Sequence, residues 1–170
     1  MAVRRILMLH GVIITIGGIP LIYLGDEVGM LNDYDYKNQT DLAADSRWLH
    51  RPPFDWEKAE LRHDRKTPTG RIYHQLLRLI QLRQQNPIFN RSDTEITYTK
   101  NKHVLAYFRH HGEQTALILA NFSDASQKIE GTRLRHLGMR KTSTDLISGR
   151  SVTVMNELQL EPYQFLVLIQ

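Results

Sequence analysis

Cysteine is absent from the 170 residues of the chain, which excludes disulfide bonds and thiolate metal sites. A large excess of one charge is also missing, because 22 basic and 18 acidic residues are interspersed rather than clustered and leave a net charge of only +4. Proteins that bind nucleic acids usually concentrate basic residues on one face. The sequence therefore predicts no nucleic-acid partner.

Motifs that carry chemistry by themselves are also missing. The chain has no Gly-x-Ser-x-Gly, no glycine-rich phosphate loop and no His-Glu-x-x-His. The spacing of Asp33, Asp35, Asp41 and Asp45 lacks the central glycine and terminal glutamate of a calcium loop, so these are interpreted as solvated carboxylates. We expect neither a metal nor a cofactor.

An uncharged run from Ile6 to Leu24 follows two arginines and imitates a signal peptide or a membrane anchor. Glycine and proline interrupt the run, and no Ala-x-Ala-like cleavage site follows it. We interpret residues 3–16 as a buried helix that stops at Gly17-Gly18. No membrane association is expected, and the cytoplasm is the default location.

Residues 21–24 (Leu-Ile-Tyr-Leu) are apolar and lead directly into Gly25-Asp26-Glu27. This pattern predicts a buried strand that delivers a loop at its C-terminal end, where parallel α/β folds bind ligands. Residues 30–67 then lose all hydrophobic periodicity and contain both tryptophans. A connection of about 40 residues is usually a functional loop.

The next segment has the signals of a helix at both ends. Thr67 offers a capping hydroxyl before Pro68, apolar residues recur at helical spacing from Ile72, and Asn86-Pro87 ends the pattern. Because the apolar residues form one stripe, we expect this helix to pack on the preceding strand.

After Pro87 the apolar period changes from that of a helix to that of a strand. Short segments rich in β-branched and aromatic residues alternate with turn residues, which predicts an antiparallel sheet or sandwich that encloses its own core. The expected strands are 94–98, 104–109, 115–121, 127–129, 151–154, 157–160 and 164–169. We place a domain boundary between residues 88 and 89.

Two motifs carry a family resemblance. Gly18-Ile19-Pro20-Leu21-Ile22-Tyr23-Leu24-Gly25-Asp26-Glu27 resembles the segment covering the eighth barrel strand of the α-amylase superfamily, glycoside hydrolase family 13. Asp45-Ser46-Arg47-Trp48-Leu49-His50-Arg51-Pro52 is similar to amylosucrases and related sucrose hydrolases. Further similarity extends over Asn101-Lys102-His103 and reaches Leu160-Glu161-Pro162-Tyr163-Gln164, so it covers nearly the whole chain.

The resemblance implies a fold in two parts. Residues 1–88 correspond to the end of a (β/α)8 barrel, with a helix, the eighth strand, a long loop and the eighth helix, and residues 89–170 to an all-β C-terminal domain. A whole barrel needs about 250 residues, so the chain is too short to contain one. The expected fold class is thus an α+β fragment of a TIM barrel followed by an antiparallel β-sandwich.

The resemblance also implies a reaction. Amylosucrase-like enzymes transfer a glucosyl group from sucrose to an α-1,4-glucan with retention and release fructose. The nucleophile and the acid/base lie on barrel strands that have no counterpart here, so no catalytic residue is expected in this chain. Arg47 is implied to bind substrate, and Glu27 and Asp45 to support the loop.

Two alternatives from other classes of protein stay open. The chain could be a non-catalytic carbohydrate-binding or interaction module whose Trp48 and Trp56 stack on sugars. It could instead be a subunit that completes a barrel supplied by another chain. An unpaired barrel edge would also permit self-association.

Overall fold

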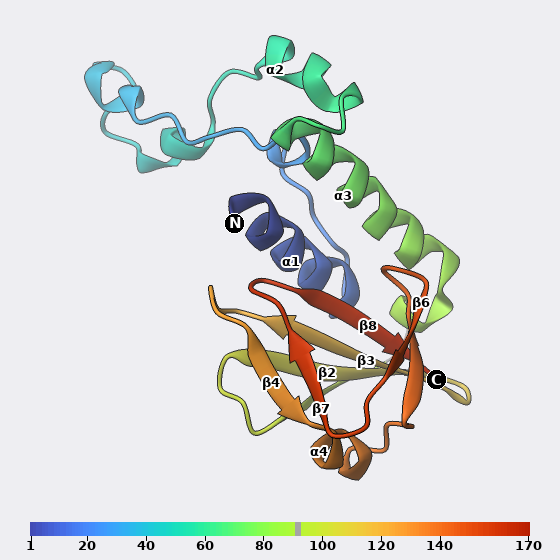
Figure 1. Cartoon of the computed structure of the whole chain (residues 1–170). Coiled ribbons are helices and arrows are strands. Elements are labelled where there is room, and N and C mark those ends of the chain that lie inside the picture. Colours follow the sequence, from blue (N-terminus) through green and yellow to red (C-terminus); the bar gives the residue numbers. More distant parts are fainter. Residues whose placement is uncertain (91–92) are drawn as a thin grey trace. The chain divides into compact units, whose positions relative to one another are not determined.

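The computed structural model describes residues 1–90 and 93–170, which divide into two compact units (Figure 1). The first unit contains residues 1–21 and 75–170, and the second contains residues 22–74. Helix α3 (Pro68–Gln85) begins in the second unit and ends in the first. The boundary expected between residues 88 and 89 concerns domains of a complete enzyme and stays a prediction.

An antiparallel sheet of six strands, in the order β1-β2-β3-β8-β5-β6, forms the centre of the first unit. Its long central strands β2 and β3 are joined by a hairpin, and β8 lies between β3 and β5. The strands of this sheet are β1 (Thr94–Thr97), β2 (Val104–His111), β3 (Gln114–Asn121), β5 (Thr142–Asp145), β6 (Arg150–Thr153) and β8 (Phe165–Ile169).

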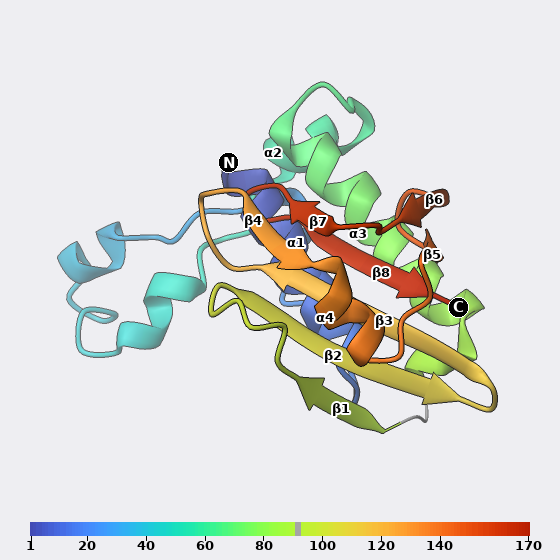
Figure 2. The ribbon, with the colours of Figure 1, turned by 60° about the horizontal axis from the view of Figure 1, so that its bottom comes forward.

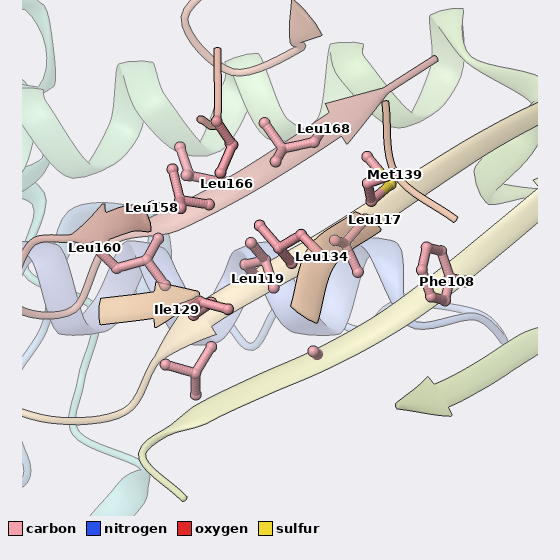
Figure 3. Packing of buried hydrophobic residues seen from close by; sticks show 13 residues of the cluster. Phe108, Leu117, Leu119, Ile129, Leu134, Met139, Leu158, Leu160, Leu166 and Leu168 are labelled. Atoms are coloured by element: carbon pink, nitrogen blue, oxygen red, sulfur yellow. The ribbon is translucent and has the colours of Figure 1, made fainter. Parts of the chain in front are cut away.

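One face of this sheet is covered by a second layer of β structure. Strands β4 (Gln127–Glu130) and β7 (Glu157–Leu160) pair with each other, and helix α4 (Gly131–His136) follows β4. Buried side chains from both layers interdigitate, among them Leu119, Leu134, Leu160 and Leu166 (Figure 3). This layer is the sandwich that the alternating pattern of the strands predicted.

The opposite face of the sheet is covered by helices. Helix α1 (Ala2–Thr15) lies behind β3 and β8 in Figure 2. A Cβ atom at Gly11 would lie 2.7 Å from the ring of Phe165, so glycine permits this close approach. Leu82 of α3 and Ile88 of the 3₁₀ helix η5 (Pro87–Phe89) are buried in the same cluster as Tyr107. The first unit thus draws its core from both sides of the expected domain boundary.

The second unit consists of short helical turns joined by loops. Its elements are η1 (Asp26–Val28), η2 (Asp35–Asn38), η3 (Ser46–His50), α2 (Trp56–Glu60), η4 (Leu61–His63) and the start of α3. Gly70 N donates to the hydroxyl of Thr67, which confirms the predicted cap of α3. The hydroxyl of Thr69 on α3 donates to the carbonyl oxygen of Val28, which ties η1 to this helix.

The helices over residues 2–15 and 68–85 and the seven expected strands are confirmed within a few residues. The strand expected over residues 21–24 is wrong, since the structure forms no strand there. A β-strand needs a neighbouring strand to accept its backbone hydrogen bonds, and within residues 1–90 and 93–170 no strand pairs with this segment. Leu21 and Leu24 are accordingly exposed. Strand β5 and helix α4 were not predicted.

No described helix combines the length and the apolar character that crossing a bilayer requires.

Candidate functional site

The loop of the second unit begins with a tight turn that holds Glu27. Gly25 adopts a left-handed conformation with φ of 100°, and Met30 N donates to its carbonyl oxygen across 2.9 Å. The carboxylate of Glu27 accepts a 2.8 Å hydrogen bond from Gly25 N. Glu27 therefore closes the turn in which it lies. This hydrogen bond is consistent with a structural role for Glu27.

The two ends of the segment that contains Arg47 are fastened to each other. Asp33 N donates to the carbonyl oxygen of Leu49 across 2.9 Å, and the ring Nδ1 of His50 lies 3.1 Å from the amide oxygen of Asn32. Residues 33–49 accordingly form a closed loop on the surface. Its stem keeps the helical turn η3, which carries Arg47, in a defined place within the unit.

Asp45 and Arg47 form a compact charged pair at the start of η3. One carboxylate oxygen of Asp45 accepts from Arg47 N at 3.0 Å and from Nε at 2.9 Å, and the other accepts from Nη2 at 2.7 Å. Asp45 is thus the N-cap of the turn and the partner of the guanidinium at once. The guanidinium plane is fixed although 71% of the Arg47 side chain is exposed.

The electrostatics of this pair follow from its hydrogen bonds. Donation from the Arg47 side chain, then from its backbone N–H, lowers the pKa of Asp45 from 3.8 to about 2. Hydrogen bonding to the same carboxylate raises the pKa of Arg47 further above its usual value. The pair therefore stays ionised throughout the physiological range, with Nη1 of Arg47 left without a partner among residues 1–90 and 93–170.

Aromatic rings lie on the same unit, but in the described part of the chain no ring-to-ring contact is formed at Arg47. Trp56 is 74% exposed and meets Phe54 edge to face, with ring centroids 4.8 Å apart. Trp48, within η3, is half-buried. Arg47 and Asp45 are brought together, whereas Glu27 serves a separate turn.

Three aspartates of this loop, Asp33, Asp45 and Asp55, accept hydrogen bonds from backbone N–H groups of short turns. Asp33 accepts from Asp35 N, and Asp55 accepts from Lys58 N at the start of α2. No cluster of three or more potential metal-ligating side chains occurs in the described part of the chain. The capping role of Asp45 was missed from the sequence, although Asp before a short helical turn is a common N-cap signal.

Comparison with known proteins finds a family model and several relatives that are similar to this chain. Residues 94–167 match the model of the maltogenic amylase C-terminal domain. Glucosylglycerate phosphorylase of Escherichia coli (strain K12) is 26% identical over 162 residues, which are 94% of this chain and 27% of that protein. Trehalose synthase of Thermus thermophilus is 25% identical over 152 residues, 75% of this chain and 15% of that protein.

A solved structure extends the match to the fold. The trehalulose synthase MutB from Pseudomonas mesoacidophila MX-45 superposes with a TM-score of 0.74 at 20% identity, over 98% of this chain and 38% of its own. The chain thus spans well under half the length of each of these relatives. The chain is thus similar to enzymes of the α-amylase superfamily, glycoside hydrolase family 13, and its residues 94–167 match a C-terminal domain of a maltogenic amylase.

Proposed function

We propose that the chain is the C-terminal part of an amylosucrase-like enzyme, which transfers glucose from sucrose to an α-1,4-glucan and releases fructose. The Asp45-Ser46-Arg47-Trp48 motif supports this assignment over the other branches of the superfamily. The crystal structure of a variant of the related trehalulose synthase was solved in complex with the substrate sucrose. Sucrose and α-glucan are accordingly the proposed ligands of the complete enzyme.

The observation that carries this proposal is the fixed guanidinium of Arg47. Asp45 occupies Nε and Nη2, so Nη1 remains to donate to a sugar hydroxyl in one direction. Lysine would keep the charge but could not supply two fixed donor directions at once. Arg47 is thus proposed to bind the glucosyl unit, with Asp45 as its direct support and Glu27 as the support of the preceding turn.

In this proposal residues 1–88 supply the last elements of a TIM barrel and residues 89–170 the β-domain beside it. The segment at residues 21–24 would become the eighth strand once neighbouring barrel strands offer it hydrogen bonds. Its exposed Leu21 and Leu24 are apolar side chains of the kind that such a strand buries.

The test uses a full-length enzyme in which this sequence follows a restored barrel. Arg47→Ala and Arg47→Lys should each lower kcat/KM for sucrose tenfold to a hundredfold, about 1.5–3 kcal/mol of lost stabilisation. Arg65→Ala is the matched control, because Arg65 is an exposed arginine of the same unit. Equal kinetics in the Arg47 variants and the control, with folding verified, would remove Arg47 from the site.

The products of that enzyme separate the proposal from its nearest rivals. Fructose together with lengthening glucan supports amylosucrase activity. Sucrose isomers would indicate the reaction type of the trehalulose synthase, and dependence on inorganic phosphate would indicate a phosphorylase, as the likeness to glucosylglycerate phosphorylase suggests.

The 170-residue chain alone is expected to be inactive. Retention requires two carboxyl groups about 5 Å apart across the scissile bond, and the resemblance assigns both to the barrel. Fructose release by the pure chain, abolished by substitution of one of its own carboxylates, would contradict this.

A free-standing binding module and a barrel-completing subunit remain the competing proposals. Sugar binding lost in Trp56→Ala would favour the first, and recovery of activity on mixing with a separate barrel chain would favour the second. Dimerisation abolished by Leu21→Asp would indicate self-association through the exposed segment.

A further inference from the structure

A groove of about 320 Å³ lies in the first unit, and the proposed reaction makes no use of it. Helices α1 and α3 form two of its sides, and the turn between β7 and β8 forms the third. Met8 and Leu79 are buried at its base, so the floor of the groove is apolar and fixed by the core. The volume falls at the lower end of the range for small-molecule sites, which is 300–1,000 Å³.

The turn over residues 161–164 holds Tyr163 in an unfavourable backbone conformation. Tyr163 has φ of 52°, a left-handed value that is unfavourable for a bulky residue. Three hydrogen bonds keep it there: Tyr163 N to the Ser123 oxygen at 3.2 Å, Gln164 N to the Glu161 oxygen at 3.0 Å, and Glu161 N to Oε1 of Gln164 at 2.7 Å. Backbone strain maintained in this way is frequent at ligand sites.

The rim of the groove is polar and has free hydrogen-bonding capacity. Arg4 of α1 and Gln75 of α3 both line it and are exposed. Neither side chain has a hydrogen-bond partner within residues 1–90 and 93–170. Tyr163 and Phe165 add half-buried aromatic rings to the same wall. An apolar floor, aromatic rings and planar polar groups thus meet in one hollow.

We propose that this groove is a sugar-binding site, separate from Arg47, that takes one or two hexose units of an oligosaccharide. A pyranose ring has an apolar face of C–H groups that packs on an aromatic ring, while its hydroxyls require donors and acceptors at the edge. Tyr163 and Phe165 supply the aromatic rings, and Arg4 and Gln75 supply the hydrogen-bonding groups at the edge. A wholly apolar ligand would instead cover Arg4 and Gln75 without satisfying them.

The choice of sugar over another amphipathic ligand rests on the proposed function in carbohydrate metabolism. The groove itself lies entirely within one compact unit, so its binding can be measured on the chain as it stands. A ligand of about a dozen non-hydrogen atoms reaches a dissociation constant of order 1 mM.

The experiment titrates the 170-residue chain with maltotriose and, separately, sucrose, and follows backbone amides by ¹H–¹⁵N NMR. We expect millimolar binding, with shifts concentrated at residues 161–165 and around Gln75. Tyr163→Gly should weaken binding at least tenfold and still fold, since glycine accepts φ of 52° without strain. Gln75→Ala should weaken it without touching the strained turn.

Tyr98→Ala is the matched control, because it removes an exposed aromatic ring that does not line the groove and should leave binding unchanged. Absence of shifts in the groove at about 20 mM of either sugar, well above the expected dissociation constant, would overturn the proposal. Equal binding in Tyr163→Gly, or occupation of the groove by toluene but by neither sugar, would overturn it as well.

The outcomes separate this site from the proposed reaction. Groove binding together with unaltered kinetics in the Arg47 variants would refute the role of Arg47 and support the groove. Loss of activity in those variants without groove binding would refute the groove alone.

Discussion

Nη1 of Arg109, on strand β2, donates a 2.9 Å hydrogen bond to the carbonyl oxygen of Ile16, the residue that follows helix α1. Arg109 is only 1% exposed, and the same nitrogen also donates to the hydroxyl of Thr94. Arg83 of α3 donates to the carbonyl oxygens of Ile14 and Gly18. Two arginines from distant parts of the chain thus satisfy the carbonyls at the C-terminus of α1, where the helix dipole favours positive charge.

Replacement of Arg109 should strongly destabilise the first unit. Arg109→Ala would leave the Ile16 carbonyl oxygen without this donor and leave a cavity beneath α1, so we expect a loss of about 2–4 kcal/mol in the free energy of unfolding. Urea denaturation followed by circular dichroism measures this loss. Arg5→Ala, at an exposed position of α1, should stay within about 0.5 kcal/mol of the parent chain.

A fragment of residues 90–170 should not fold by itself, although its strand pattern predicts a sheet that encloses its own core. The fragment lacks Leu82, Ile88 and Phe89, whose burial against the sheet stabilises by about 1.5–3 kcal/mol each. Their sum is comparable to the whole stability of an ordinary domain, about 5–15 kcal/mol. The fragment should give a poorly dispersed NMR spectrum.

The control for this truncation joins residues 1–21 to residues 75–170 through a flexible Gly-Ser linker. It keeps every part of the first unit and should give a dispersed spectrum. A well-folded fragment of residues 90–170 would show that the helices are dispensable for the sheet.

Tyr107 should make the chain sensitive to alkali. Its hydroxyl lies 2.6 Å from that of Thr15. Burial raises the pKa of Tyr107 well above its usual 10.0, although the hydrogen bond with Thr15 and, less strongly, the charge of Arg109 oppose this. The unfolded chain releases this proton near pH 10 while the folded chain keeps it. The contribution of Tyr107 to stability is therefore complete below about pH 10 and declines as the pH rises further.

Tyr107→Phe tests this linkage. The variant should lose about 1 kcal/mol at pH 7 with the hydrogen bond, but its stability should fall less steeply above pH 10 than that of the parent chain. The other tyrosines titrate in both proteins, so the difference between the two curves reports Tyr107. Parallel curves would mean that Tyr107 has the same pKa in both states.

The carboxyl group of Asp45 should titrate with a midpoint near 2 rather than 3.8. The pKa of Asp45 is lower in the folded chain than in the unfolded chain. The stabilisation of η3 by this carboxylate is therefore present above about pH 4 and is lost as the pH falls through 2. Carbon-13 NMR of the carboxyl group measures the midpoint. Arg47→Ala should move it towards 3.8, whereas Arg51→Ala, which removes the weakest of the stabilising charges, should move it much less. Similar midpoints in both variants would show that the hydrogen bonds of Arg47 are not the cause.

Elements with a strong local signal were predictable from the sequence. Helix α3 has a capping hydroxyl, a proline at its first position and a proline after its end, and its predicted limits are confirmed. Strand β5 has no such signal, because the residues it turns inward are Ser143 and Asp145. The buried carboxylate of Asp145 accepts from Ile147 N, Ser148 N and Val167 N, partners that only the folded chain assembles.

The burial and the pairing of individual charged side chains were likewise not predictable from the sequence. An arginine within a predicted strand is expected to face solvent. Arg109 is nevertheless buried, because its guanidinium donates to the carbonyl groups of Ile16, just after α1, and of η5. At the candidate site, the sequence indicated Arg47 and Asp45 through a family motif. Their pairing depends on the backbone of η3, which no hydrophobic pattern specifies.

The position of strand β8 governs when the sheet can form during translation. Strand β8 is the last strand in chain order, yet it lies between β3 and β5 in the middle of the sheet. A ribosome therefore releases β3 and β5 before it has made the strand that joins them, and α1 waits longest of all for the surface on which it packs. Until β8 has been synthesised, the nascent chain exposes the apolar faces and open edges of β3 and β5, so this is the stage of translation at which aggregation is most to be expected.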